Sequence, residues 1–191
     1  MIRGSVTTLA LLVLSTGVLV GQKPPMHPGT VREGKLWFDG RATAGDFTGV
    51  TTTVTGAMEG AAELSAVRGW VEAPVNTLKT GNDHRDRDLN NKSMESDKYP
   101  VIRFELEQVQ PGEGPADSMA ATLHGRMLIH GETREVALPS ILSFSPDGVR
   151  VRSTFPLNLK DYKIGGLSRA LGLFKMYPDI VVHVDVSFQS R

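Results

Sequence analysis

The chain has 191 residues, 40% of them hydrophobic and 22% charged, which is the length and composition of one soluble domain with a sizeable core. Lysine plus arginine and aspartate plus glutamate both number 21, so the net charge is zero and no broad positive field exists for nucleic acid or acidic lipid. The absence of cysteine excludes disulfides, thiolate catalysis, cysteine-based zinc sites and lipid attachment at an N-terminal cysteine.

The segment 1–21 has the layout of a secretory signal. Arg3 precedes an apolar run over 6–20, and polar chain follows. The run is shorter than the roughly 20 apolar residues that span a bilayer comfortably. We expect either cleavage after Gly17 or Gly21 or retention of the segment as an uncleaved anchor.

Both outcomes export the rest of the chain to the periplasm or out of the cell. The proline-rich segment 22–34 is then expected to be a linker, and 35–191 to be the folded domain. A buried helix of a cytoplasmic protein is a weaker interpretation, because so apolar a segment would stand directly before this linker.

From Lys35 onward, hydrophobic residues recur with a period of two, which is the period of a half-buried β-strand. Turn signals separate the strands, among them Pro146-Asp147-Gly148 and the segment 130–133. The expected strands are 35–42, 51–60, 68–76, 101–109, 121–130, 149–155 and 179–188.

About eight short strands, each with one apolar face, indicate an antiparallel sheet closed into a barrel, since closure removes exposed strand edges. The interior of such a barrel is either filled by side chains or holds one small ligand. Periodicity alone does not distinguish a packed core from an apolar tunnel. The residues expected to face the interior are Ile102, Phe104, Leu106, Leu123, Met127, Ile129, Val182, Val184 and Val186.

The stretch "TGNDHRDRDLNN" (80–91) is the most charged of the chain, and we expect a helix over 83–97. Asn82 or Asp83 can accept hydrogen bonds from the free N–H groups of the first helical turn. A second helix is expected over 167–177, where leucine and phenylalanine follow one another at spacings of four and three.

Helical spacing brings His84 and Asp88 onto one face, which suggests a metal site, but two ligands do not make one. Arg85 and Arg87 would pair with the neighbouring acids. We therefore expect this cluster to cap a helix and form salt bridges.

Two further motifs favour plain interpretations. His124 and His130 lie an even number of residues apart on one expected strand and share a face with Arg126, so we expect them to be solvated. "GLSRA" (166–170) faintly matches a nucleophile elbow, but the only later histidine, His183, is expected in mid-strand on a polar face.

Several stretches together resemble the YceI family of exported bacterial proteins. The most specific are "TGNDHRDRDL" leading to "KYPVIRFE", and "GRMLIHGETREVALP", and the matches cover nearly all of 36–188 in the family's order. The resemblance implies an all-β, eight-stranded antiparallel lipocalin-like barrel with one or two short helices near its mouth. It also implies a cavity that binds a long isoprenoid, such as a polyprenyl phosphate or a quinone precursor, for carriage or storage, without catalysis or cofactor.

Two stretches depart from the family pattern near one end of the barrel. In "LKDYKIGG" (159–166), Lys160 stands for the basic residue and Lys163 stands where glycine is common. The segment 167–179 replaces a connection that is usually short. These departures bear on the ligand and its head group rather than on the fold.

We predict that the hydrocarbon chain of the ligand meets an apolar wall and that an arginine of the charged stretch meets its polar head group, because a guanidinium donates paired hydrogen bonds to phosphate. The predicted ligand-binding residues are Phe104, Ile102, Leu106, Leu123, Met127, Ile129, Val182, Val184, Arg85 and Arg87.

Three alternatives stay open at this stage. The ligand could be another amphiphile, such as a fatty acid or fatty amide. The cluster 83–88 with His130 could form a metal site or a metal-dependent enzyme. The barrel could also be a stress-response or structural protein with a filled interior. Proximity to a membrane and formation of a homodimer are open as well, whereas nucleic acid is not an expected partner.

Overall fold

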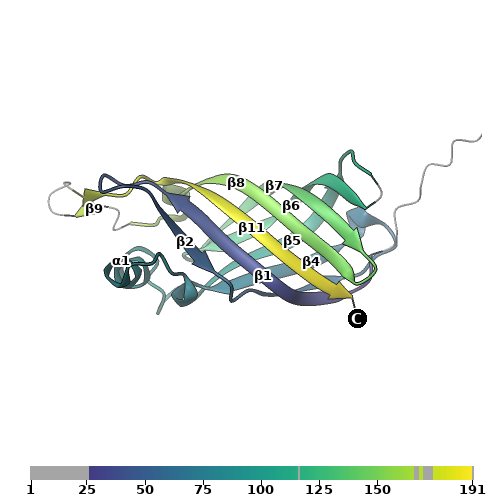
Figure 1. Ribbon diagram of the computed structural model, residues 1–191, viewed down its shortest axis with the longest axis horizontal. Coiled ribbons are helices and arrows are strands. Elements are labelled where there is room, and N and C mark those ends of the chain that lie inside the picture. The colour runs from purple at the N-terminus through teal and green to yellow at the C-terminus, as the bar shows by residue number, and fades with distance from the viewer. Residues whose placement is uncertain (1–25, 116, 166–167, 170–173, 191) are drawn as a thin grey trace, which may run out of the picture.

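The computed structural model describes residues 26–115, 117–165, 168–169 and 174–190. Nine strands of these residues form one antiparallel sheet (Figure 1). They are β1 (Gly29–Gly40), β2 (Phe47–Thr51), β3 (Thr55–Glu59), β4 (Arg68–Pro74), β5 (Val101–Pro111), β6 (Ser118–Ile129), β7 (Glu132–Ser145), β8 (Gly148–Asn158) and β11 (Asp179–Ser190).

The sheet is closed, because β1 pairs with β11 along nearly its whole length, from Gly29 opposite Ser190 to Asp39 opposite Val181. β2 and β3 pair with successive parts of β1 and together act as one strand of the barrel. The predicted eight-stranded antiparallel barrel is therefore confirmed.

The described part of the chain begins before the expected start of the domain at 35. Gly29 and Thr30 already pair with both β11 and β3, so the backbone groups of the segment 29–34 belong to the barrel rather than to a linker. The expected export signal over 1–21 lies outside the described residues.

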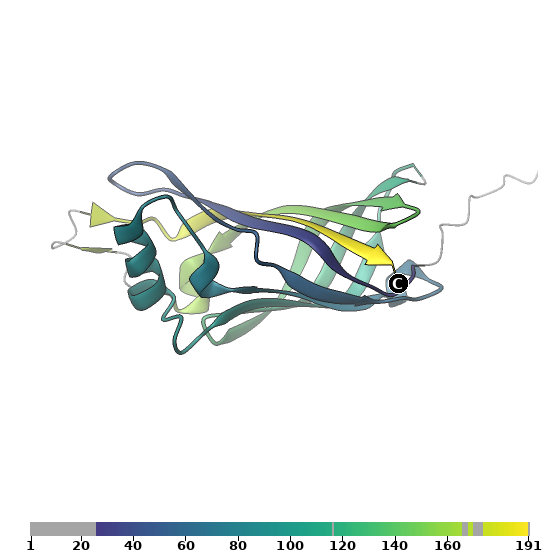
Figure 2. The ribbon, with the colours of Figure 1, turned by 60° about the horizontal axis from the view of Figure 1, so that its bottom comes forward.

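Short helical segments gather mainly at one end of the barrel. This end, called the α1 end here, also holds the turn between β6 and β7 (Figure 2). Among the described residues, no helix has the length and apolar character needed to cross a bilayer. The segments at the α1 end are η2 (Val75–Thr77), α1 (Asp83–Asp88), η3 (Leu89–Ser93) and η4 (Leu159–Tyr162), while η1 (Leu64–Ala66) lies at the far end.

α1 begins where expected, because the Asn82 side chain accepts a hydrogen bond of 2.9 Å from the backbone N–H of Arg85. The helix is shorter than the expected 83–97. It ends at Asp88 and continues as a π-helical turn, η3, whose closing bond runs from the N–H of Met94 to the carbonyl of Leu89.

The second expected helix, over 167–177, is wrong for the residues that the structure describes. β9 (Ser168–Arg169) and β10 (Phe174–Lys175) pair as a two-stranded antiparallel ladder, and Met176 bridges to Ala42. A short apolar run does not by itself distinguish a helix from a strand, which is why the sequence pattern led to the wrong prediction for these residues.

Candidate functional site

The barrel encloses a cavity that runs between its two ends. The space open to the centre of a water molecule is about 180 Å³, whereas one water needs roughly 10–15 Å³ on that scale. The interior is therefore far more open than a packing defect. Met94 and Ile164 line it at the α1 end, and Met26 and Leu64 line it at the far end.

All the residues that the strand pattern directs inward border this cavity. Their contact with a ligand stays a prediction, but their position is that of a wall. They are Ile102, Phe104, Leu106, Leu123, Met127, Ile129, Val182, Val184 and Val186.

The solvent-accessible surface of the inward side chains shows where the open space lies. Ile102, Phe104 and Leu106 of β5 point inward and are only partly buried, whereas Leu123 and Met127 of β6 are 8% and 6% exposed. An inward side chain can keep accessible surface only where the interior is hollow. The hollow therefore lies against β5, and the same argument extends it to Leu36, Val71, Val151 and Val184.

The sequence prediction missed much of the lining. Residues outside the strands, such as Leu89, Met94, Leu159 and Ile164, have no period from which their direction could be predicted. Methionine is unusually frequent, and its flexible, polarizable side chain adapts to ligands of different shape. The lining methionines are Met26, Met58, Met94, Met127 and Met176.

Two charged residues border the cavity without placing their charge inside. Glu72 and Arg103 occupy strand positions whose side chains point outward, so only their backbone atoms border the cavity. The side chain of Ser153 also lies at the lining, and its hydroxyl donates to the carbonyl of Pro139 at 2.7 Å. The resulting interior surface is almost wholly hydrocarbon and thioether.

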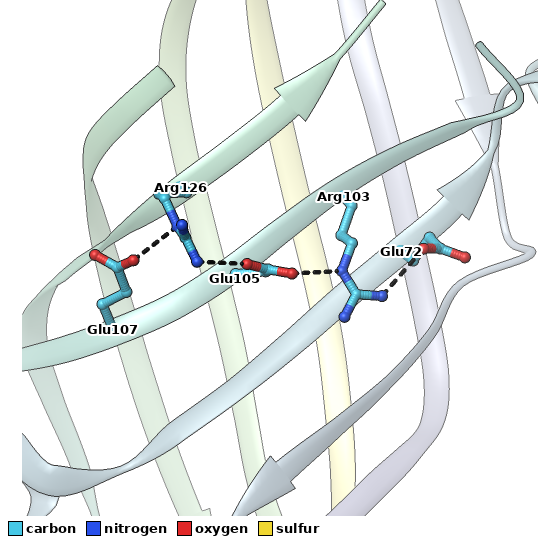
Figure 3. A network of polar contacts seen from close by, with 5 residues as sticks. All are labelled: Glu72, Arg103, Glu105, Glu107 and Arg126. Atoms are coloured by element: carbon cyan, nitrogen blue, oxygen red, sulfur yellow. Dashed lines mark hydrogen bonds and ion pairs between the residues drawn. The ribbon is translucent and has the colours of Figure 1, made fainter. Parts of the chain in front are cut away.

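A row of ion pairs crosses the outer face of the same wall (Figure 3). Arg103 contacts Glu72 at 3.2 Å and Glu105 at 3.0 Å. Arg126 then contacts Glu105 at 3.0 Å and Glu107 at 2.8 Å. The row ties β4, β5 and β6 together on the outside of the wall that borders the hollow.

The charged stretch 80–91 is chiefly structural. Arg85 does not pair with an acid as expected. Its Nε and Nη2 donate to the hydroxyl and the carbonyl of Thr80, both at 2.8 Å, and its guanidinium lies 4.4 Å from the ring centre of Phe47. Asp86 is buried and accepts from the N–H and the hydroxyl of Thr80. These bonds fix the start of α1 against the barrel.

The two predicted head-group arginines are absent from the cavity lining as the structure describes it. Arg87 borders a separate polar hollow on the surface, together with Lys79 and Asn90. A contact of either arginine with a head group stays a prediction that needs the head group to project out of the barrel.

The expected pair of His84 and Asp88 forms, at 3.1 Å, and Lys92 occupies the other carboxylate oxygen at 3.0 Å. Within the described ranges, no group of three or more histidine and acidic side chains is placed to hold a metal ion. His130 in particular lies with Glu95 rather than with this cluster.

The expectation that His130 is solvated beside His124 is wrong. β6 ends at Ile129, and His130 occupies the turn to β7 with a φ of 50°, which rotates it into the protein, where it is 7% exposed. Next to it, burial raises the pKa of Tyr162, while the charge of Arg134 acts in the opposite direction.

Similar proteins support the barrel interpretation. A YceI-like domain model matches residues 30–188. No curated protein matches the chain. Among solved structures, a polyisoprenoid binding domain from Saccharophagus degradans implicated in plant cell wall breakdown has a TM-score of 0.71 at 15% identity, covering 87% of this chain and 99% of its own.

Burkholderia cenocepacia BcnA has a TM-score of 0.68 at 11% identity, covering 81% of this chain and 95% of its own. The Campylobacter jejuni YceI protein has a TM-score of 0.59 at 15% identity, covering 75% of this chain and 84% of its own. At such identities the structural likeness establishes a shared fold. Because the domain model spans nearly the whole barrel, the chain belongs to the YceI-like domain family.

Proposed function

We propose that this protein binds the hydrocarbon chain of an isoprenoid lipid inside the barrel and carries or stores that lipid in the periplasm. The observation that carries the proposal is the hydrocarbon-lined cavity that runs between the two ends of the barrel. The printed description of the Saccharophagus degradans relative as polyisoprenoid binding agrees with it.

The driving force is the removal of hydrocarbon from water. Each buried CH2 group contributes about 0.8 kcal/mol, so a chain of several isoprene units gains enough to offset the cost of association. A charged head group could not share this gain, because burial of an unpaired charge is strongly unfavourable. We therefore expect the head group to stay at a mouth of the barrel.

We propose binding and transport rather than catalysis. The lining places hydroxyl groups at Ser93 and Ser153, and the charges of Glu72 and Arg103 are engaged on the outer face. Such an interior can dissolve a lipid chain, and the lining formed by the described residues places no acid, base or strong nucleophile along it.

The test is the chain-length dependence of binding. Purified protein is titrated with linear isoprenoid alcohols of increasing length and with fatty acids of equal carbon number. Affinity for the isoprenoids should rise with each unit until the chain outgrows the cavity and should exceed that for the fatty acids. Equal affinities would favour a general amphiphile carrier, and absence of binding by both series would contradict a lipid-binding function.

Export of the protein is part of the proposal and rests on the signal-like segment 1–21. Cell fractionation and mass measurement of the protein from the periplasmic fraction test it. A mass that lacks the first 17 or 21 residues would show cleavage. Recovery of the protein from the cytoplasm alone would contradict carriage in the periplasm.

A further inference from the structure

His130 joins three segments at the α1 end. It belongs to the turn between β6 and β7, its Nδ1 lies 3.2 Å from the backbone carbonyl of Tyr162 in η4, and its Nε2 lies 2.9 Å from a carboxylate oxygen of Glu95. The ring of Tyr99 packs against it with centroids 4.4 Å apart. One buried imidazole thus connects the segment after η3 to the barrel body.

Both nitrogens of His130 face oxygen atoms that can only accept hydrogen bonds. Nδ1 faces a carbonyl, and Nε2 faces a carboxylate. A neutral imidazole has one N–H and can satisfy only one of them, whereas an imidazolium donates to both. The observed geometry is therefore fully bonded only when His130 carries two protons.

Glu95 is the carboxylate in direct contact with His130. Two cations of the adjoining segments have partners of their own: Lys163 pairs with Glu132 at 2.8 Å, and Arg134 donates to the carbonyl of Asp161. Lys98, which follows Glu95 in the chain, places its ammonium group over the ring of Tyr99. The carboxylate of Glu95 thus controls the contact.

The segment 82–95 has the construction of a gate. It begins after Gly81, with a φ of 74°, and ends at Glu95, with a φ of 45°, so the backbone changes direction at both ends. Leu89, Ser93 and Met94 within it line the cavity. Arg85 and Asp86 fix its first half to Thr80. Its last residue, Glu95, is held to the barrel by the contact with His130.

We propose that the pair of Glu95 and His130 is a protonation-dependent latch that closes the cavity at the α1 end. When His130 is an imidazolium, the latch holds Leu89 and Met94 over the lumen. Loss of one proton removes the ion pair with Glu95 and leaves one N–H for two acceptors, so the half of the gate from 89 to 95 is held more weakly and opens more often. Opening therefore increases as pH rises and the ring loses its second proton.

Hydrogen–deuterium exchange of the backbone amides of 82–95, corrected for its intrinsic pH dependence, tests the latch without any ligand. In the unmodified protein, protection should fall about tenfold or more between pH 5 and 8, the scale of one charged hydrogen bond. Glu95→Ala should be poorly protected at both pH values. Glu95→Gln should stay protected at pH 8, because its amide can donate to the neutral ring.

The matched control is the pair of His183 and Asp39, which has a similar separation of 3.1 Å on the outer wall. Asp39→Asn should leave the exchange of 82–95 unchanged. The latch is refuted if protection in the unmodified protein does not depend on pH, if Glu95→Ala exchanges like the unmodified protein, or if Asp39→Asn has the effect expected of Glu95→Ala.

The role of the latch in ligand entry rests on the proposed function and is measured separately. Uptake of N-phenyl-1-naphthylamine, a neutral apolar fluorophore, is followed by stopped flow at pH 5 and 8 and should be faster at pH 8. No uptake combined with pH-dependent exchange would refute the lipid cavity and leave the latch standing. Uptake combined with pH-independent exchange would refute the latch alone.

Discussion

Val184 and Val186 lie two residues apart on β11 and point into the same barrel, yet Val184 keeps accessible surface and Val186 is 1% exposed. Both side chains border the cavity, so the open space is wider beside Val184, and the interior is more closely packed around Val186. This difference between two identical side chains on one strand provides a direct test of where the open space lies.

Val184→Phe should fill part of the cavity. We expect the free energy of unfolding to change by less than about 1 kcal/mol and the affinity for an apolar fluorophore to fall at least tenfold, because the ring occupies the ligand's volume. Val186→Phe is the matched control and should cost about 1–3 kcal/mol through overpacking. Urea unfolding and fluorophore titration measure both effects, and equal destabilisation would contradict this position of the cavity.

Arg103→Ala should destabilise the wall formed by β4, β5 and β6. The change removes ion pairs with Glu72 and Glu105 and the stacking of the guanidinium 4.4 Å from the ring centre of Trp70. We expect a loss of about 1 kcal/mol that shrinks at high salt, since the pairs are partly exposed. Urea unfolding at low and high salt measures the loss, and Arg32→Ala, at an exposed pair of 3.8 Å, should have almost no effect.

Gly125→Ala should be among the costliest single-methyl changes in the barrel. A Cβ atom at this position of β6 would overlap the carbonyl oxygen of Glu105, so the strands would have to separate. We expect a loss of about 1–3 kcal/mol in thermal or urea unfolding. Gly165→Ala, where no atom lies within 4 Å of the added methyl group, should stay within about 0.5 kcal/mol of the parent. Similar values for the two variants would argue against the close approach of β5 and β6.

Tyr162 should make the protein sensitive to alkali. Burial raises its pKa, so the folded protein holds the phenolic proton more tightly than the unfolded chain does. The stabilisation is complete below the ordinary tyrosine pKa of about 10 and is lost as pH rises through the higher folded value. The free energy of unfolding should therefore fall above pH 10. In Tyr162→Phe the free energy of unfolding should fall less steeply over the same range. Equal slopes for the parent and for Tyr162→Phe would show that Tyr162 does not carry the effect.

The barrel was predictable from the sequence because its signal is local and repeated. Successive side chains of each strand point alternately to the interior and to solvent. Residues such as Phe104 and Val182 could therefore be assigned to the interior from their neighbours alone. The same rule failed after Leu106, where the register with β6 shifts before Gln108 and brings Val109 to the inside. A bulge changes the parity of a strand without leaving a clear mark in its composition.

The contacts of the α1 end were not predictable, because they join residues far apart in the chain. His130 was assigned to a solvated strand face, and its burial depends on Glu95 and Tyr162, neither of which is near it in sequence. Arg85 was expected to pair with neighbouring acids, but the turn at Gly81 brings Thr80 within reach of its guanidinium. The hollow itself depends on the balance of side-chain volumes around the bore, which no single strand determines.

Closure of the barrel by the first and last strands has a consequence for the order of folding. Gly29 meets Ser190 only after all the strands from β1 to β11 have been synthesised, so the seam between β1 and β11 is a contact of very large sequence separation. Proteins dominated by such contacts fold slowly, on the scale of milliseconds to seconds. A chain truncated before β11 would leave the edges of β1 and β8 unpaired, and it should aggregate rather than form a smaller container.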